Sequence, residues 1–407
     1  MNKTKILMIS DHALSTSGVA IQSKYLIEGL VNTGKYEVVQ VGAARYHEDL
    51  TPQKVNKDFT ILPCVGFGDK ETIRSLLVSE KPDALIIFTD IRFFGHIWDM
   101  EDEIHEVCPI LYWHVWDNYP VPDYNDYVYN SVDKVNCISH LTYDLLKSKY
   151  RDKIEYVPHG LPAKDFYPFS KEEIDKYREA VLSDKKDWFV GLWVNRNIRR
   201  KRPADVIMSW KIFLEKLEKE KGHKNALLIM HTDPEDEAGT DLIKVAKHLK
   251  VEKNLRFSRE ELGFKELNML HNISDVCINI SFAEGFGLTT LQSLYAGTPI
   301  VVSNTGGLSR QCIDSITGKQ YGIAIKPAVT TISGVINTPY INEDYVTAED
   351  TASAILKVCI EKQDYSNASS YAMQEFNLED SIKKWDRSIQ EEIIKNKNKK
   401  YFRIKEF

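Results

Sequence analysis

The sequence predicts an α/β protein that contains two doubly wound domains. Short apolar runs rich in Val and Ile alternate with amphipathic stretches from the first residues onward, and the same alternation starts again near residue 188. Strands that are joined through helices form a parallel sheet, which helices cover on both faces. With 407 residues, of which 43% are hydrophobic and 28% charged, the chain is long and apolar enough for two hydrophobic cores.

The first half of the chain carries one series of these elements. Residues 20–31 have helical periodicity and lie between two strand-like runs, and residues 141–149 repeat this arrangement further along. The strands that we expect in this half are residues 5–10, 37–41, 84–88, 110–114, 134–138 and 154–157.

The second half repeats the architecture with a new series of strands and helices. We expect strands at residues 188–194, 226–230, 255–257, 276–280, 300–302 and 322–325. Helical patterns occur at residues 203–217, 264–273, 348–361 and 378–395.

Prolines and glycines interrupt the periodicity between the two series, at residues 157–162 and 166–168, and mark a linker. We therefore expect an N-terminal domain at residues 1–162 and a C-terminal domain at residues 163–376. A final helix with a basic tail, residues 377–407, is expected to pack back toward the N-terminal domain. Two such domains joined by a hinge are expected to face one cleft, where open α/β sheets bind ligands.

Charge and composition narrow the function classes. The net charge of −6 excludes the strongly positive whole-protein surface that dominates nonspecific nucleic-acid binding. Six cysteines lie far apart without a Cys-x-x-Cys pair, which favours reduced thiols in a cytosolic protein. No stretch approaches the roughly 18 uninterrupted apolar residues of a membrane span, and the N-terminal apolar run is too short for a signal peptide. We expect a cytoplasmic protein without a transmembrane segment.

One acidic residue stands before a glycine-rich turn in the second half. Glu284 is followed by Gly285, Phe286 and Gly287, and a helix is expected to begin near Leu288. Backbone N–H groups at such a helix N-terminus favour an anion, and a carboxylate beside it can accept hydrogen bonds from hydroxyl groups. A sugar carried on a phosphate suits both features, although Glu284 would also fit the ordinary role of a helix cap.

A second glycine turn follows the next predicted strand. Gly306 and Gly307 stand there, and glycine permits a ligand to approach the backbone closely. The turn lies one strand–helix unit after Glu284, so we expect both turns at the same edge of the sheet.

A basic segment, residues 193–203, ends the first strand of the second domain. Basic side chains at this place can neutralise phosphate, and a solvated charge run is the alternative. We choose Arg196 and Lys201 as the ligand contacts. The remaining cations of the segment, which we expect to face solvent, are Arg199, Arg200 and Arg202.

His114 ends a first-domain strand within an aromatic segment. A lone histidine at a strand end is more often structural, so a structural role and a role near the ligand both stay open. The aromatic side chains around His114 can stack on a sugar or a base, or can belong to the core. They are Trp113, Trp116, Tyr119 and Tyr124.

Together these motifs resemble the retaining, nucleotide-sugar-dependent glycosyltransferases with the GT-B fold that are often called family four. The Glu-Gly-Phe-Gly motif corresponds to residues 284–287, the small-Gly-Thr-Pro run to residues 296–299, and the Gly-Gly turn to residues 306–307. The linker and the loop at residues 17–20 are similar as well, so the likeness spans nearly the whole chain.

The resemblance implies a nucleoside-diphosphate sugar as donor and retention of the anomeric configuration, by front-face attack in which the leaving phosphate helps to deprotonate the acceptor. It implies diphosphate contacts by Arg196 and Lys201, a phosphate-facing loop at Gly18, and a place for His114 near the sugar and the acceptor. With Glu284, these two cations and His114 are the expected catalytic residues. The expected donor-binding residues are Gly18, Gly285, Phe286, Gly287, Leu288, Gln292, Gly306 and Gly307. Because no Asp-x-Asp motif occurs, we expect no obligatory metal and no other cofactor.

The sequence departs from the family pattern at two positions. Gln292 stands where the family has a second Glu that holds the ribose hydroxyls, and Arg310 stands where an acid often follows the Gly-Gly turn. Glutamine can still hydrogen-bond a diol, but without the strength that a charge adds. These departures bear on donor affinity or nucleotide identity more than on the reaction.

The expected function is transfer of a hexosyl or pentosyl group from a nucleotide sugar to a hydroxyl acceptor. Acceptor classes are a saccharide, a lipid-linked sugar or a small metabolite. An alternative is a transferase of the kind found in large tailed bacteriophages, which would act on hydroxymethylated bases in DNA within the host cytoplasm. A nucleotide-sugar epimerase of similar fold is a weaker alternative because that group lacks the Glu-Gly-Phe-Gly arrangement. A catalytically silent nucleotide-sugar-binding module is the alternative of another class.

Overall fold

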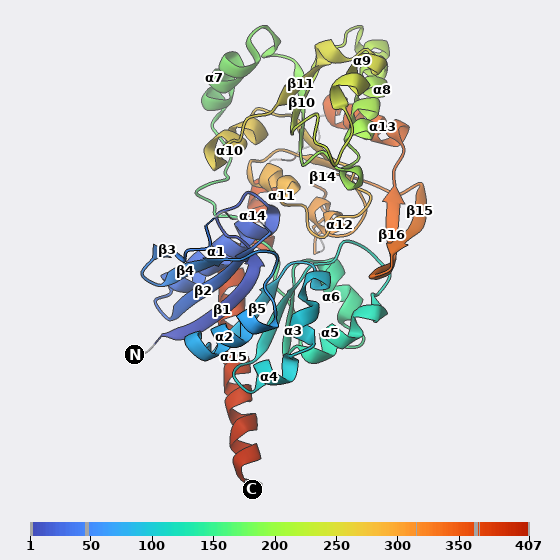
Figure 1. Cartoon of the computed structure of the whole chain (residues 1–407). Coiled ribbons are helices and arrows are strands. Elements are labelled where there is room, and N and C mark those ends of the chain that lie inside the picture. The colour runs from blue at the N-terminus through green and yellow to red at the C-terminus, as the bar shows by residue number, and fades with distance from the viewer. Residues whose placement is uncertain (1–2, 45–48, 315, 362–364, 366, 406–407) are drawn as a thin grey trace. The chain divides into compact units, whose positions relative to one another are not determined.

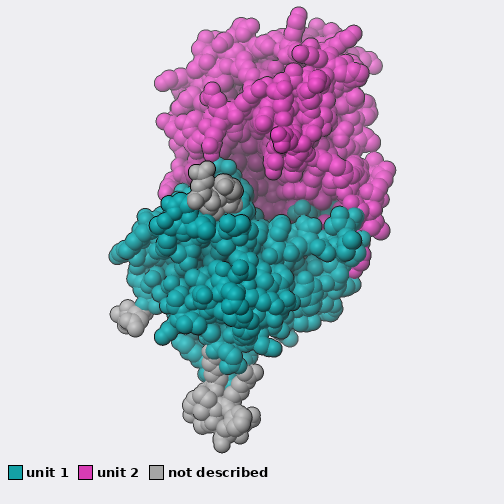
Figure 2. Space-filling view, viewed as in Figure 1, with its two compact units in different colours: residues 1–160, 334–339, 377–407 teal, residues 161–333, 340–376 magenta. Residues whose placement is uncertain are grey.

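The computed structural model describes residues 3–44, 49–314, 316–361, 365 and 367–405, with side chains up to residue 399 (Figure 1). The chain divides into two compact units, coloured separately in Figure 2. Unit 1 comprises residues 1–160, 334–339 and 377–407, and unit 2 comprises residues 161–333 and 340–376. The first division lies two residues before the expected one, and the final helix groups with unit 1. The last two residues of the expected basic tail, 406–407, lie outside the described residues.

Unit 1 is built on an eight-stranded sheet with the strand order β3-β4-β2-β1-β5-β6-β7-β8. All neighbouring strands pair in parallel except β3 and β4, which pair in antiparallel fashion at one edge. The strands are β1 (Thr4–Asp11), β2 (Tyr36–Ala43), β3 (Gln53–Asn56), β4 (Phe59–Pro63), β5 (Ala84–Phe88), β6 (Ile110–His114), β7 (Lys134–Cys137) and β8 (Ile154–Tyr156).

Local side-chain caps fix where helices of unit 1 begin. The Ser17 hydroxyl accepts a hydrogen bond of 3.0 Å from the Ala20 N–H at the start of α1, and Ser139 caps α6 in the same way. The final helix carries the buried ring of Trp385, which lies 5.4 Å from the ring of Trp113. The helices are α1 (Gly18–Asn32), α2 (Lys70–Glu80), α3 (Gly95–Trp98), α4 (Glu101–His105), α5 (Asp126–Ser131), α6 (His140–Leu146) and α15 (Leu378–Lys405), with the 3₁₀ turns η1 (Ile91–Phe94) and η2 (Asp123–Asn125).

Unit 2 contains a six-stranded, fully parallel sheet with the order β11-β10-β9-β12-β13-β14. Its strands are β9 (Phe189–Val194), β10 (Ala226–His231), β11 (Leu255–Ser258), β12 (Val276–Asn279), β13 (Ile300–Ser303) and β14 (Gly322–Ile325). Each lies within two residues of a predicted strand at both ends. The predicted α/β class with parallel sheets in both halves is confirmed.

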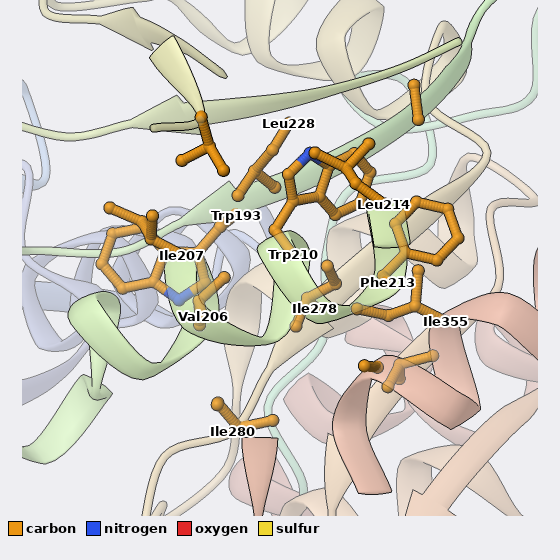
Figure 3. Close-up of a cluster of buried hydrophobic side chains, with 14 of the residues drawn as sticks. Trp193, Val206, Ile207, Trp210, Phe213, Leu214, Leu228, Ile278, Ile280 and Ile355 are labelled. Atoms are coloured by element: carbon orange, nitrogen blue, oxygen red, sulfur yellow. The ribbon is translucent and has the colours of Figure 1, made fainter. Parts of the chain in front are cut away.

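Helices cover this sheet and close its core (Figure 3). Helix α8 begins with proline, whose fixed φ suits the first helical position. One core cluster joins the strands to α8 and α13 through Trp193, Leu228, Ile278, Val206, Ile207, Trp210, Phe213, Leu214 and Ile355. The helices are α7 (Lys171–Leu182), α8 (Pro203–Lys221), α9 (Leu242–Leu249), α10 (Phe264–Asn272), α11 (Leu288–Tyr295), α12 (Leu308–Cys312), α13 (Ala348–Ile360) and α14 (Ala368–Glu375), with the 3₁₀ turns η3 (Ser183–Lys185), η4 (Arg199–Lys201) and η5 (Glu252–Asn254).

A two-stranded hairpin, β15 (Val329–Val335) and β16 (Thr338–Tyr345), lies between β14 and α13 in the chain. The sequence patterns did not predict it, nor the edge strand β3 and its neighbour β4. Large side chains of the hairpin such as Ile332 are exposed, so its residues do not form the buried apolar run from which the other strands are recognised.

The described part of the chain adds three findings. All six cysteines are unpaired thiols there, and four of them are buried. Across the described ranges, no helix has the length and apolar character to cross a bilayer. Within the same ranges, no group of three or more His, Cys, Asp or Glu side chains is arranged to hold a metal ion.

Candidate functional site

Three loops of unit 2 meet at one edge of its sheet. Residues 195–202 follow β9, residues 280–287 follow β12, and residues 304–307 follow β13. These strands are neighbours in the order β9-β12-β13 and run in parallel, so their carboxyl ends share an edge. Open parallel sheets bind ligands at this kind of edge.

Glu284 is buried at this edge between two cations. Its carboxylate forms an ion pair with Lys201, lies 3.4 Å from the Arg200 guanidinium, and accepts a 3.2 Å hydrogen bond from the Ser281 hydroxyl. Burial alone would raise the pKa of Glu284, but attraction to Lys201 and Arg200 and the hydrogen bonds outweigh it and lower the pKa to about 2. Glu284 is therefore an anion at any ordinary pH.

The glycine turn does not use Glu284 as a helix cap. Gly287, with a φ of 93°, is the residue that precedes α11, and no side chain caps this helix. Leu288 begins the helix and is partly exposed. The capping alternative for Glu284 is therefore not what the structure shows, since its carboxylate contacts Lys201, Arg200 and Ser281 instead.

The two glycine turns contact each other through their backbones. The Gly307 N–H donates a 2.8 Å hydrogen bond to the Glu284 carbonyl. A Cβ atom at position 307 would lie 2.4 Å from the Gly285 carbonyl oxygen and 2.6 Å from the Phe286 Cα, which is closer than real Cβ contacts. Glycine is required at position 307 by this contact alone, independently of any ligand.

Gly307→Ala is therefore expected to push the two turns apart. Overpacking of this kind destabilises proteins by about 1–3 kcal/mol. We expect a lower unfolding temperature and weaker nucleotide binding, measured by calorimetry. Gly95→Ala is the matched control, because nothing lies within 4 Å of the Cβ it would add. Wild-type stability and affinity in Gly307→Ala would contradict the turn contact.

Two cations of the basic segment, residues 193–203, do not face solvent as expected. Arg202, expected to face solvent, is only 9% exposed and donates to Asp205 at 2.9 Å and to the Val346 carbonyl at 3.1 Å. Arg200, also expected to face solvent, is half-buried and donates to the Ala283 carbonyl at 2.7 Å. The expectation was wrong for both. Residues 199–201 form one 3₁₀ turn, which sends successive side chains in different directions, and Arg202 follows this turn with a left-handed backbone, φ 52°.

The two cations chosen as ligand contacts lie in different surroundings. The Lys201 side chain is 12% exposed and forms an ion pair with the Glu284 carboxylate. Arg196 is 68% exposed and forms an ion pair with Asp236, with Nε 2.7 Å from the carboxylate. Asp236 belongs to the acidic loop that follows β10, so this loop contacts the basic segment. Lys201 therefore has a fixed position, whereas Arg196 is held only by a surface pair, which contributes little stability.

Gln292 and Arg310, the positions that depart from the family pattern, differ in burial. Gln292 is buried on α11 with its Oε1 3.3 Å from Nε2 of His271, while Arg310 is exposed on α12. Burial lowers the pKa of His271 to about 4, so this ring is neutral. His271 also lies 2.6 Å from the Ser293 hydroxyl. Gln292 is thus held in place by a buried histidine that sequence reasoning did not identify.

Gln311 is a second residue that sequence reasoning missed. Its side-chain amide donates to the Phe286 carbonyl at 2.7 Å and to the Gly287 carbonyl at 3.1 Å, and its oxygen accepts from the Thr290 hydroxyl at 2.7 Å. The signal available in the sequence was a glutamine four residues after the Gly-Gly turn, and the structure buries it on the five-residue helix α12. Gln311 fixes the first glycine turn from α12.

In unit 1, Gly18 and His114 lie at the carboxyl ends of strands. Gly18 begins α1 just after Ser17, whose hydroxyl donates to Asp11 at 2.6 Å. His114 ends β6 and is fully buried, with Nε2 3.0 Å from the Tyr129 hydroxyl. Burial lowers the pKa of His114 to about 3, so the ring is neutral. The donor-loop role of Gly18 and the ligand role of His114 stay predictions.

The aromatic segment around His114 is mostly core. Trp113 is buried, with its ring 4.3 Å from that of Phe88, and Trp116 is buried with its ring 6.1 Å from that of Tyr124. Tyr119 is exposed. The alternatives for this cluster were stacking on a ligand and packing in the core. Trp113 and Trp116 pack in the core.

The comparison with protein families shows what this arrangement is similar to. Residues 173–337, which include Glu284, Lys201 and both glycine turns, match the family model described as "Glycosyl transferases group 1". The match covers less than half of the chain, so this segment is similar to the group 1 glycosyltransferases.

Known proteins extend the likeness. A curated relative, the alpha-monoglucosyldiacylglycerol synthase of Acholeplasma laidlawii, is 27% identical over 161 residues, which is 39% of this chain and 38% of that protein. The match therefore spans well under half the length of that relative.

Two solved structures share the fold of the whole chain. The sucrose-phosphate synthase of Thermosynechococcus elongatus has a TM-score of 0.74 at 15% identity, over 96% of this chain and 99% of the other. Anabaena HepE in complex with UDP and glucose has a TM-score of 0.68 at 14% identity, over 96% and 100%. The chain thus has the GT-B fold.

Proposed function

We propose that the protein is a retaining glycosyltransferase that moves a sugar from a nucleoside-diphosphate donor to a hydroxyl acceptor. The observation that carries the proposal is the buried Glu284 anion between Lys201 and Arg200, beside two glycine turns whose backbones touch. A carboxylate suits sugar hydroxyls, and the cations and backbone N–H groups suit a diphosphate. The UDP and glucose in the solved HepE complex support this ligand class.

The proposed reaction breaks the bond between the anomeric carbon and the diphosphate oxygen, and the diphosphate leaves with the electron pair. Lys201, Arg200 and Arg196 would stabilise the negative charge on that leaving group, an electrostatic effect that is large in protein sites. Glu284 would orient the sugar by accepting hydrogen bonds from its hydroxyls. The acceptor oxygen forms the new bond on the same face, and its proton goes to the departing phosphate. We propose no metal and no further cofactor in these steps.

The acceptor classes in this proposal are a saccharide, a lipid-linked sugar and a small metabolite. The name of the Acholeplasma relative adds a diacylglycerol lipid to the acceptors worth testing. The donor-binding role of Gly18 and the cytoplasmic location belong to the same proposal.

The alternative of a bacteriophage-type transferase acting on DNA depended on the basic C-terminal tail and on the cations at residues 199–202. Arg199 pairs with Glu343, Arg200 contacts Glu284, and Arg202 pairs with Asp205. Cations that are already paired with acidic residues of the protein contribute less to a phosphate-binding surface. Modified DNA is therefore one arm of the acceptor test rather than the leading acceptor.

Binding and turnover of a nucleotide-sugar panel test the proposal. We expect one of the UDP-, GDP- or ADP-sugars to bind in calorimetry and to be hydrolysed slowly without an acceptor. Radiolabelled sugar from that donor is then offered to oligosaccharides, lipid acceptors and hydroxymethylated DNA. Binding without hydrolysis or transfer would support the silent module, and no binding to any donor would contradict both functions.

Arg196→Ala is expected to weaken nucleoside-diphosphate affinity while leaving stability almost unchanged. Charge-assisted hydrogen bonds contribute about 1.5–3 kcal/mol, so the dissociation constant should rise roughly tenfold or more. Asp236→Ala is the matched control, since it removes the same ion pair but leaves the arginine free for phosphate. Calorimetry that shows equal affinity in Arg196→Ala and wild type would rule out the phosphate contact.

A further inference from the structure

The hairpin β15–β16 reaches the candidate site through two consecutive acids of β16. Successive side chains of a strand point to opposite faces. Glu343 and Asp344 accordingly hold different partners, and these partners belong to different loops of the site. The proposed reaction above makes no use of either acid.

Asp344 connects both glycine turns to the hairpin. Its carboxylate accepts a 2.7 Å hydrogen bond from the hydroxyl of Thr305, the residue directly before Gly306. Its backbone N–H donates at 2.7 Å to the carbonyl of Phe282, two residues before Glu284. The second carboxylate oxygen accepts at 2.6 Å from the Thr330 hydroxyl on β15. One residue of the hairpin thus contacts the loops that follow β12 and β13.

Glu343 holds the third loop from the other face of β16. Both of its oxygens accept from the Arg199 guanidinium, at 3.1 and 2.9 Å, and the Tyr345 hydroxyl also donates to it. Burial alone would raise the pKa of Glu343, but the hydrogen bonds from Arg199 and Tyr345 lower it. Arg199 also lies over the Phe282 ring, 4.8 Å from its centre. Since Arg199 and Lys201 share one 3₁₀ turn, this pair restrains the backbone that carries Lys201.

We propose that Asp344 is a positioning residue of the donor site, which sets the separation of the two glycine turns without touching the donor. This inference rests on the proposed function. Thr305 is buried, so its hydroxyl keeps one orientation as long as the Asp344 carboxylate accepts from it. Catalytic groups that are misplaced by about 1 Å can lose roughly 10²-fold in rate. Such a shift lowers turnover more than ground-state binding, since alignment matters most in the transition state.

The test compares Asp344→Ala, Thr305→Val and the double variant, using the best-binding nucleotide sugar of the panel and its hydrolysis without acceptor. Calorimetric stoichiometry with the matching nucleoside diphosphate gives the concentration of folded sites, so kcat is counted per site. We expect each single variant to lower kcat by about 10- to 100-fold with a much smaller change in KM. The double variant should lose little more than either single variant, because both remove the same contact.

Two controls separate positioning from general stability. Thr330→Val removes the hydrogen bond between the same carboxylate and β15, and should leave kcat close to wild type. Thr305→Ser keeps the hydroxyl and should retain activity. Wild-type kcat per site in Asp344→Ala and Thr305→Val, or additive losses in the double variant, would overturn this inference alone. Failure of the unaltered protein to bind any donor would overturn it together with the proposed function.

Discussion

Glu284→Gln is expected to slow transfer strongly and leave nucleoside-diphosphate binding intact or stronger. The substitution keeps the size of the side chain but removes the negative charge that now neutralises Lys201 and Arg200. Both cations then attract the diphosphate without competition, while the sugar loses its charged hydrogen-bond acceptor. Loss of a group aimed at the transition state lowers kcat by about 10²–10³-fold. Calorimetry with the diphosphate and steady-state kinetics with the donor measure the two effects separately.

Asp275→Asn is the matched control for this prediction. Asp275 also pairs with an arginine, Arg178 at 2.6 Å, but it precedes β12 and lies at the opposite edge of the same sheet. The control is expected to lower stability and keep kcat per folded site. Turnover at the wild-type rate in Glu284→Gln would refute the role assigned to this carboxylate, whatever its effect on binding.

The parallel sheets follow from local patterns in the sequence. Strands β5 and β6 coincide with the predicted residues 84–88 and 110–114, because buried strands of a parallel sheet are continuous apolar runs. Helix α15 continues to residue 405, ten residues beyond its predicted end. No glycine or proline occurs after residue 378 to stop it. Apolar periodicity thus locates elements well where burial and a stop signal are both present.

The hairpin shows where this reasoning fails. Ile332 is exposed on β15 and Ile336 is exposed in the turn that follows, and polar residues of β16 contact loops that are distant in the sequence. Thr305 and Asp344 are 39 residues apart, yet their side chains meet at 2.7 Å. Such a contact depends on tertiary packing, which local propensity does not contain. The residues that fix the site from outside it, Gln311 and Asp344, were for this reason not predicted.

The sequence predicted part of the candidate site. Glycines at two turns and the acid before one of them indicate an anion-binding edge, and the structure brings these turns into contact. The pairing of Lys201 with Glu284 was not foreseen, because it joins residues 83 positions apart. The ion pair gives Glu284 a second role besides ligand binding, because Glu284 also fixes the position of Lys201 before any donor binds.

Lys201→Met is expected to weaken donor binding and to make the protein sensitive to mild acid. Loss of one charged contact should lower nucleoside-diphosphate affinity by about 10- to 100-fold. In the unaltered protein the pKa of Glu284 is about 2, below its ordinary 4.5, so the stability from its ionisation is present above pH 4.5 and is lost as the pH falls toward 2. Lys201 is the largest favourable charge on this carboxylate, so its removal raises the pKa of Glu284 and moves the acid loss to higher pH.

The measurement for Lys201→Met is the unfolding temperature and the diphosphate affinity between pH 7 and pH 4. Lys216→Met is the matched control, since Lys216 pairs with Glu349 on α8 and α13 of the same unit, outside the three loops of the site. The control should reproduce the wild-type pH profile. If Lys201→Met and the wild-type protein lose stability at the same acidic pH, the pKa of Glu284 does not depend on this lysine. The electrostatic account of the site would then fail, because the same ion pair holds the acid ionised and places the lysine for the leaving phosphate.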